Sequence, residues 1–155
     1  MSSSDELLAR YEADVDEAFG FLRTQYGCVK ARRGMHVPEC WVGYQNRHVR
    51  ITVSFELGSG PWVVLERRSW FRFWIDDEGY DLVFLLMERA PDEYKRRLVK
   101  NVDDPALRDE LRRLASLLRE HGDDVLRGDF QVFPRLRTIA KEHFERTSLE
   151  RYGRH

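Results

Sequence analysis

The stretch VRITVSFEL at residues 49–57 alternates apolar and polar side chains without interruption. Successive side chains of a β-strand point to opposite faces, so this alternation predicts a strand with one face on a core and the other in water. The side chains expected on the covered face are Val49, Ile51, Val53, Phe55 and Leu57.

The neighbouring segments have the composition of further strands joined by tight turns. The expected strands are residues 28–33, 39–44, 62–67 and 70–75. Gln45-Asn46-Arg47 is a plausible hairpin connection because asparagine tolerates positive φ, and Gly58-Ser59-Gly60-Pro61 predicts a turn. Consecutive strands with short connections predict an antiparallel meander of four or five strands, with helices covering one face.

Helical periodicity occurs on both sides of these strands. Residues 7–26 repeat apolar side chains at steps of three and four, and Gly27 is expected to end this first helix in the left-handed conformation. Residues 82–87 predict a short buried helix that ends before Pro91.

Two more helices are expected towards the C-terminus. Asp104 has the position of an N-cap with Pro105 in the first turn, and leucines then recur until Gly122. A last helix begins near Pro134, and residues 148–155 are expected to form a frayed tail. The chain is therefore predicted to be a single α+β domain, residues 1–155, with an antiparallel sheet packed against an N-terminal helix and C-terminal helices.

Length and composition limit the class of protein. A chain of 155 residues is long enough to bury a core, and its net charge of -1 argues against a general nucleic-acid or membrane-surface binder. The N-terminus has no secretory signal pattern, and no apolar run is long enough to span a bilayer. We therefore expect a cytoplasmic protein.

The best candidate metal ligands are Cys28, His36, Cys40 and His48. Thiolate and imidazole are ligands that zinc prefers, but seven, three and seven residues separate these side chains, which is not the spacing of a zinc knuckle. Cys40 and His48 could still face each other across a hairpin. Buried thiols and ordinary loop histidines remain the simpler interpretation, so no metal or organic cofactor is expected.

Catalytic motifs are absent from the sequence. The acidic pairs 76–77, 103–104 and 123–124 lie beside expected turns or helix starts, where aspartate caps free amides. No phosphate-binding loop, nucleophile elbow or zinc helix is present. The sequence therefore favours a non-catalytic protein. A small enzyme or ligand-binding domain is the alternative, because the residues of a catalytic triad meet in the folded chain and need have no characteristic spacing in the sequence.

Two surfaces are candidates for binding a partner. Trp70, Arg72 and Trp74 would share one face of the expected strand 70–75, and tryptophan and arginine are enriched at interaction hot spots. The alternative is that a C-terminal helix covers them. The outward face of the first helix carries acids that include Asp14 and Glu17, which form either an ordinary solvated face or a field that steers a basic partner. The other acids of that face are Asp5, Glu12 and Asp16.

Three features of the chain are characteristic when they are taken together. They are the first helix, the segment Tyr44-Gln45-Asn46 before the alternating strand, and the segment Leu126-Arg127-Gly128-Asp129-Phe130 after the leucine-rich helix. Together they resemble small bacterial proteins of unknown function, some of which are similar to the immunity proteins of toxin systems. The resemblance covers most of the chain and implies a cytoplasmic, non-catalytic protein that binds another protein, for which an immunity-type inhibitor is one form.

Overall fold

The computed structural model describes residues 3–68, 78–95 and 99–153. It is an α+β fold with a five-stranded antiparallel sheet in the order β1-β2-β3-β4-β5. The strands are β1 (Val29–His36), β2 (Glu39–Gln45), β3 (Val49–Glu56), β4 (Gly60–Arg67) and β5 (Gly79–Asp81). The helices are α1 (Ser3–Ala18), α2 (Phe21–Tyr26), α3 (Leu82–Arg89), α4 (Pro105–His121), α5 (Asp123–Leu126) and α6 (Phe133–Tyr152).

The alternating segment forms β3, as predicted. Val49, Ile51, Val53 and Phe55 are each 0% exposed, whereas Leu57 lies beyond the end of the strand and is 39% exposed. Ile51 has Tyr44 of β2 and Leu65 of β4 as its cross-strand neighbours. One face of the sheet is therefore continuous core.

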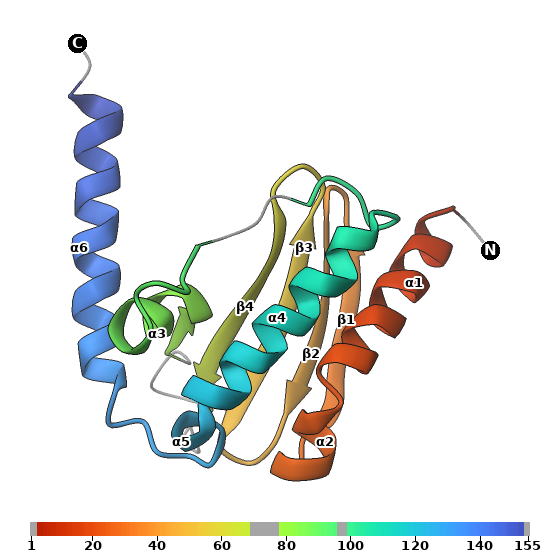
Figure 1. Cartoon of the computed structure of the whole chain (residues 1–155), viewed down its shortest axis with the longest axis horizontal. Coiled ribbons are helices and arrows are strands. Elements are labelled where there is room, and N and C mark those ends of the chain that lie inside the picture. Colours follow the sequence, from red (N-terminus) through yellow and green to blue (C-terminus); the bar gives the residue numbers. More distant parts are fainter. Residues whose placement is uncertain (1–2, 69–77, 96–98, 154–155) are drawn as a thin grey trace.

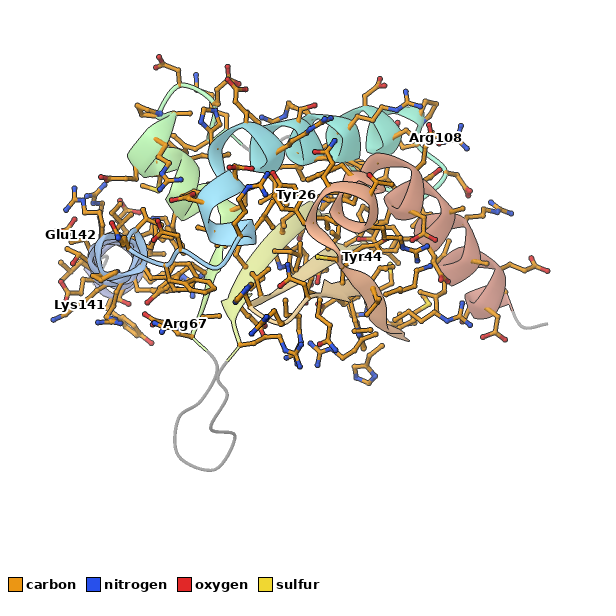
Figure 2. The ribbon with its side chains drawn as sticks, turned by 90° about the horizontal axis from the view of Figure 1, so that it is seen from below. Tyr26, Tyr44, Arg67, Arg108, Lys141 and Glu142 are labelled. Atoms are coloured by element: carbon orange, nitrogen blue, oxygen red, sulfur yellow. The ribbon has the colours of Figure 1, made fainter. Side chains whose placement is uncertain are left out.

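Helices α1, α2 and α4 lie on this covered face (Figure 1). Tyr11 and Val15 of α1 and Leu107, Leu111 and Leu118 of α4 are fully buried against it. Seen from below, α6 lies beyond the edge of the sheet, so no described helix covers the opposite face (Figure 2). We call that opposite face the open sheet face.

Local signals at the helix ends are mostly confirmed. The Asp104 carboxylate accepts a hydrogen bond from the Ala106 amide at the start of α4, and Gly27, with φ of 65°, ends α2. The expected single first helix is wrong, because it is interrupted at Phe19 and Gly20 between α1 and α2. Glycine has a low helix propensity, which accounts for the interruption, and Phe19 and Leu22 on its two sides are both buried.

Two boundaries also differ from the predictions. β1 continues to His36 rather than ending at residue 33, and α6 continues through Tyr152, so residues 148–152 are helical rather than a frayed tail. The expected strand 70–75 lies outside the described residues. The fifth described strand, β5, consists of the three residues immediately before α3 and was not predicted.

Asn46 forms the connection between β2 and β3 without positive φ. Its side-chain oxygen accepts hydrogen bonds from the amides of His48 and Val49, which makes an Asx-type turn. Its side-chain amide donates to the carbonyl oxygens of Tyr26 and Leu126, each at 3.1 Å. This one residue therefore ties the hairpin to α2 and α5.

None of the described helices is long and apolar enough to cross a membrane.

Candidate functional site

The first predicted surface, Trp70, Arg72 and Trp74, lies outside the described residues, so its position relative to the sheet stays a prediction. The second predicted surface, on α1, is fully described.

The acids of α1 contact basic side chains of neighbouring elements. Arg108 Nε of α4 lies 2.8 Å from Asp14 Oδ1, and Arg112 Nη2 lies 2.7 Å from Glu17 Oε1. The Asp14 side chain is only 11% exposed. Much of the negative charge expected on this helix is therefore neutralised within the chain, which weakens any field that would steer a basic partner.

The other side of α1 contributes to a polar network with β1 and β2. Lys30 Nζ lies 2.5 Å from Glu12 Oε1 and 2.6 Å from Asp16 Oδ2, and the Tyr44 hydroxyl donates to Asp16. Burial raises the pKa of Asp16, but hydrogen bonds from Lys30 and Tyr44 outweigh burial and lower it overall. Burial and the neighbouring Asp16 together raise the pKa of Tyr44. Arg33 Nη1 also lies 2.5 Å from Glu12 Oε2, so two cations face two carboxylates and the network stabilises the α1–sheet contact.

This network predicts a specific acid sensitivity. The pKa values of Glu12 and Asp16 lie below their ordinary values of 4.5 and 3.8, so the stability they supply is present above those values and is lost as pH falls through the lowered values. We expect Lys30→Met to remove about 1–2 kcal/mol at neutral pH and to move the acid-induced loss to higher pH. Urea unfolding across a pH series measures both effects.

The matched control for this prediction is Arg32→Met, an exposed position on the same strand. If Lys30→Met and Arg32→Met have the same pH profile as the unmodified chain, the network does not contribute to stability.

The candidate metal ligands are not brought together. Cys40 pairs in register with Phe55, so it does not face His48, which lies in the turn. Burial raises the pKa of the Cys28 thiol to about 11 and, with Glu39 nearby, that of Cys40 to about 12, which disfavours the thiolate that binds metal. Within the described ranges, no group of three or more His, Cys, Asp or Glu side chains could hold a metal ion.

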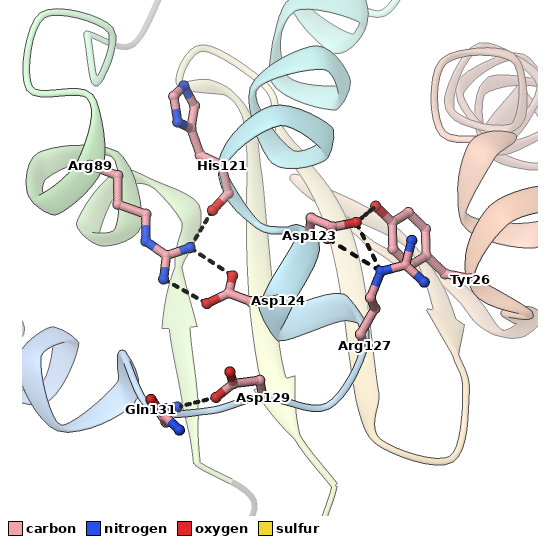
Figure 3. Close-up of polar contacts among 8 residues, drawn as sticks. All are labelled: Tyr26, Arg89, His121, Asp123, Asp124, Arg127, Asp129 and Gln131. Atoms are coloured by element: carbon pink, nitrogen blue, oxygen red, sulfur yellow. Dashed lines mark hydrogen bonds and ion pairs between the residues drawn. The ribbon is translucent and has the colours of Figure 1, made fainter.

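The acidic pair at the start of α5 forms ion pairs and hydrogen bonds with neighbouring helices rather than an end cap (Figure 3). Arg89 of α3 binds both carboxylate oxygens of Asp124 at 2.7 Å. Asp123 accepts from the Tyr26 hydroxyl at 2.5 Å and from Arg127 Nε at 3.1 Å. Because α5 is held to α2 and α3 in this way, these carboxylates are structural.

The open sheet face carries two tryptophans that sequence analysis did not select. In register, Gly34, Trp41, Ser54 and Trp62 form one row across four strands. A Cβ atom on Gly34 would lie 2.4 Å from the Trp41 ring, so the ring lies directly against the glycine backbone. Both tryptophans are half-buried within the described chain, and they form an apolar band across this face.

Two features beside this band are unfavourable in the isolated chain. Thr52 Oγ1 is buried and has no hydrogen-bond partner within the part of the chain that the structure describes. Glu39 and Glu56 are directly opposite each other on β2 and β3, an arrangement in which like charges destabilise a strand pair. A basic group from another molecule would relieve the second of these costs.

A separate hollow lies between α3, β5 and α6. This α3–α6 groove has a volume of about 820 Å³. Phe84, His143 and Phe144 form an aromatic cluster on its wall, with the Phe84 ring centroid 5.6 Å from that of His143 and 6.3 Å from that of Phe144. Its polar lining includes Lys95, Arg146 and Glu150.

No family model, curated protein or solved structure matches this chain. The open sheet face and the α3–α6 groove are therefore assigned from the geometry and chemistry of the chain alone. The sequence could have predicted the position of Trp41 and Trp62 on the open sheet face, since each tryptophan alternates with buried residues of its own strand. The groove had no such signal, because four separate segments of the chain form it.

Proposed function

We propose that this chain is a non-catalytic protein-binding module whose partner binds the open sheet face. The observation that carries the proposal is the row of Trp41, Ser54 and Trp62 on a sheet face that no described helix covers. Tryptophan is enriched at binding hot spots because it contributes a large apolar area.

The tryptophans are also suited to binding because they are held in place. The ring of Trp41 packs against Gly34, and Trp62 lines a small hollow together with Val83 and Tyr94. A side chain that is already ordered loses little entropy on binding. The opposed Glu39 and Glu56 carboxylates favour a partner that places a basic side chain next to the apolar band.

The resemblance described above supports one form of this function. An immunity-type inhibitor binds a toxin and blocks it in the bacterial cytoplasm, which requires a protein-binding surface and no catalytic group. A toxin with an exposed apolar patch bordered by lysine or arginine is therefore the first partner to test.

The proposal is tested by capture from the native cell followed by affinity measurement with the purified partner. Trp41→Ala and Trp62→Ala are each expected to weaken binding by about 2 kcal/mol or more, the size typical of hot spots. Tyr152→Ala is the matched control, because Tyr152 is an aromatic residue that is 79% exposed on α6. A partner that binds all four proteins equally would overturn the proposal.

The surfaces expected from sequence are tested in the same assay. Trp74→Ala tests the segment outside the described residues. Changing Asp14 and Glu17 to lysine would place like charges against Arg108 and Arg112, so the thermal stability of that variant must be measured together with its binding.

A second candidate function is small-ligand binding, which the α3–α6 groove favours. Its volume of about 820 Å³ is within the range of small-molecule sites, and it combines aromatic walls with a few polar groups.

A further inference from the structure

We propose that the α3–α6 groove binds a single-chain amphiphile with an anionic head group, of the class represented by fatty carboxylates. This inference deepens the ligand-binding candidate and does not depend on the tryptophans of the open sheet face. It depends on the shape of the groove, its apolar wall and the charges along its rim.

The apolar wall continues the buried side of α6. Phe133, Leu136 and Ala140 of this helix are buried against the rest of the fold. Further along the helix, Phe144 and Thr147 follow at the same spacing and line the groove, but Phe144 is 62% exposed. The helix therefore presents an apolar side that the described chain leaves unfilled.

The opposite wall is also apolar. Val83, Phe84 and Met87 of α3 line the groove, and so does Val64 of β4. An occupant that touches both walls must be apolar over most of its length, because unpaired polar groups are costly to bury there. A flexible hydrocarbon chain satisfies this condition.

The charges along the groove favour an anion at one end of that occupant. Lys95 and Arg146 line the groove and form no ion pair with any described residue. The groove also contains two carboxylates, but Asp81 is engaged at the start of α3, where it accepts from the Val83 amide at 3.0 Å. Glu150 is the remaining acid, so two cations and the imidazole of His143 face one available carboxylate.

The test uses three commercial probes below their critical micelle concentrations and isothermal titration calorimetry with the full chain. Dodecanoate is expected to bind saturably with one molecule per chain, and dodecyltrimethylammonium, which has the opposite head-group charge, to bind about tenfold more weakly. Dodecyl maltoside, with a neutral head group, should lie between them. Equal binding of the three probes, or no binding of dodecanoate, would overturn the proposal.

Variants locate the site. Phe144→Asp is expected to abolish dodecanoate binding, and Arg146→Glu to weaken it about tenfold by losing a charge-assisted contact. The matched controls are Leu149→Asp and Arg151→Glu, two exposed positions of the same helix that do not line the groove. Binding that survives Phe144→Asp, or that the controls weaken equally, would overturn the assignment.

Failure of this inference is distinguishable from failure of the protein-binding proposal. Trp41→Ala should leave dodecanoate binding unchanged, and a circular dichroism melting curve confirms that this variant is folded. Loss of dodecanoate binding in a folded Trp41→Ala variant would place the amphiphile on the open sheet face and refute the groove site.

Discussion

Arg113→Met is expected to destabilise the protein by about 3–5 kcal/mol, because it removes the guanidinium that pairs with a buried carboxylate. Glu110 of α4 is only 2% exposed. Its two oxygens accept from Arg113 at 2.7 Å and 2.9 Å, and the same guanidinium donates to the carbonyl oxygens of Glu93 and Lys95. Urea unfolding followed by circular dichroism measures the change, which is a large part of the stability of an ordinary domain.

The control is the double variant Glu110→Leu/Arg113→Met. Replacing both members of a buried ion pair by apolar residues is often close to neutral, so the double variant should recover most of the lost stability. The carbonyls of Glu93 and Lys95 belong to exposed residues and can bind water instead. If the double variant is as unstable as Arg113→Met alone, the cost arises from the lost anchoring of residues 93–95 rather than from the Glu110 charge.

The sequence features that predicted the fold correctly are local ones. The alternation of β3, the Asp104 cap before Pro105 and the terminal Gly27 each depend on a few adjacent residues, and all three are confirmed. Their physical causes, side-chain period and backbone hydrogen bonding, act within one element.

The contacts that the sequence did not reveal depend on packing in the folded chain. Asp14 and Arg108 are separated by 94 positions, so nothing near Asp14 indicated that its charge would be paired. Glu110 and Arg113 have the spacing of an ordinary surface pair on a helix, and only packing shows that the carboxylate is buried. The charge pattern of α1 therefore predicted an exposed acidic face, whereas in the fold basic side chains of other elements neutralise much of its charge.

The two candidate sites also differ in whether a local pattern in the sequence indicates them. Trp41 alternates with buried Cys40 and Val42, so its place on the open sheet face could have been predicted from phase alone. The groove could not, because α3 and α6 are neighbours only in the folded chain. In the sequence, the apolar wall of the groove cannot be distinguished from buried core, since Phe144 continues the spacing of the buried residues of α6.

Ile51→Ala is expected to destabilise the protein by about 2–5 kcal/mol, because it opens a cavity in the centre of the sheet. Ile51 is 0% exposed, and its side chain lies on the covered face between Tyr44 and Leu65. Thr52→Val, one residue away on the same strand, is the matched control: it removes the buried hydroxyl that has no partner among the described residues and should be neutral or stabilising by up to about 1 kcal/mol. Chemical denaturation of both variants measures the two sides of β3 independently. A loss below about 1 kcal/mol for Ile51→Ala would contradict the covered-face register, and a large loss for Thr52→Val would show that its hydroxyl is hydrogen-bonded in solution.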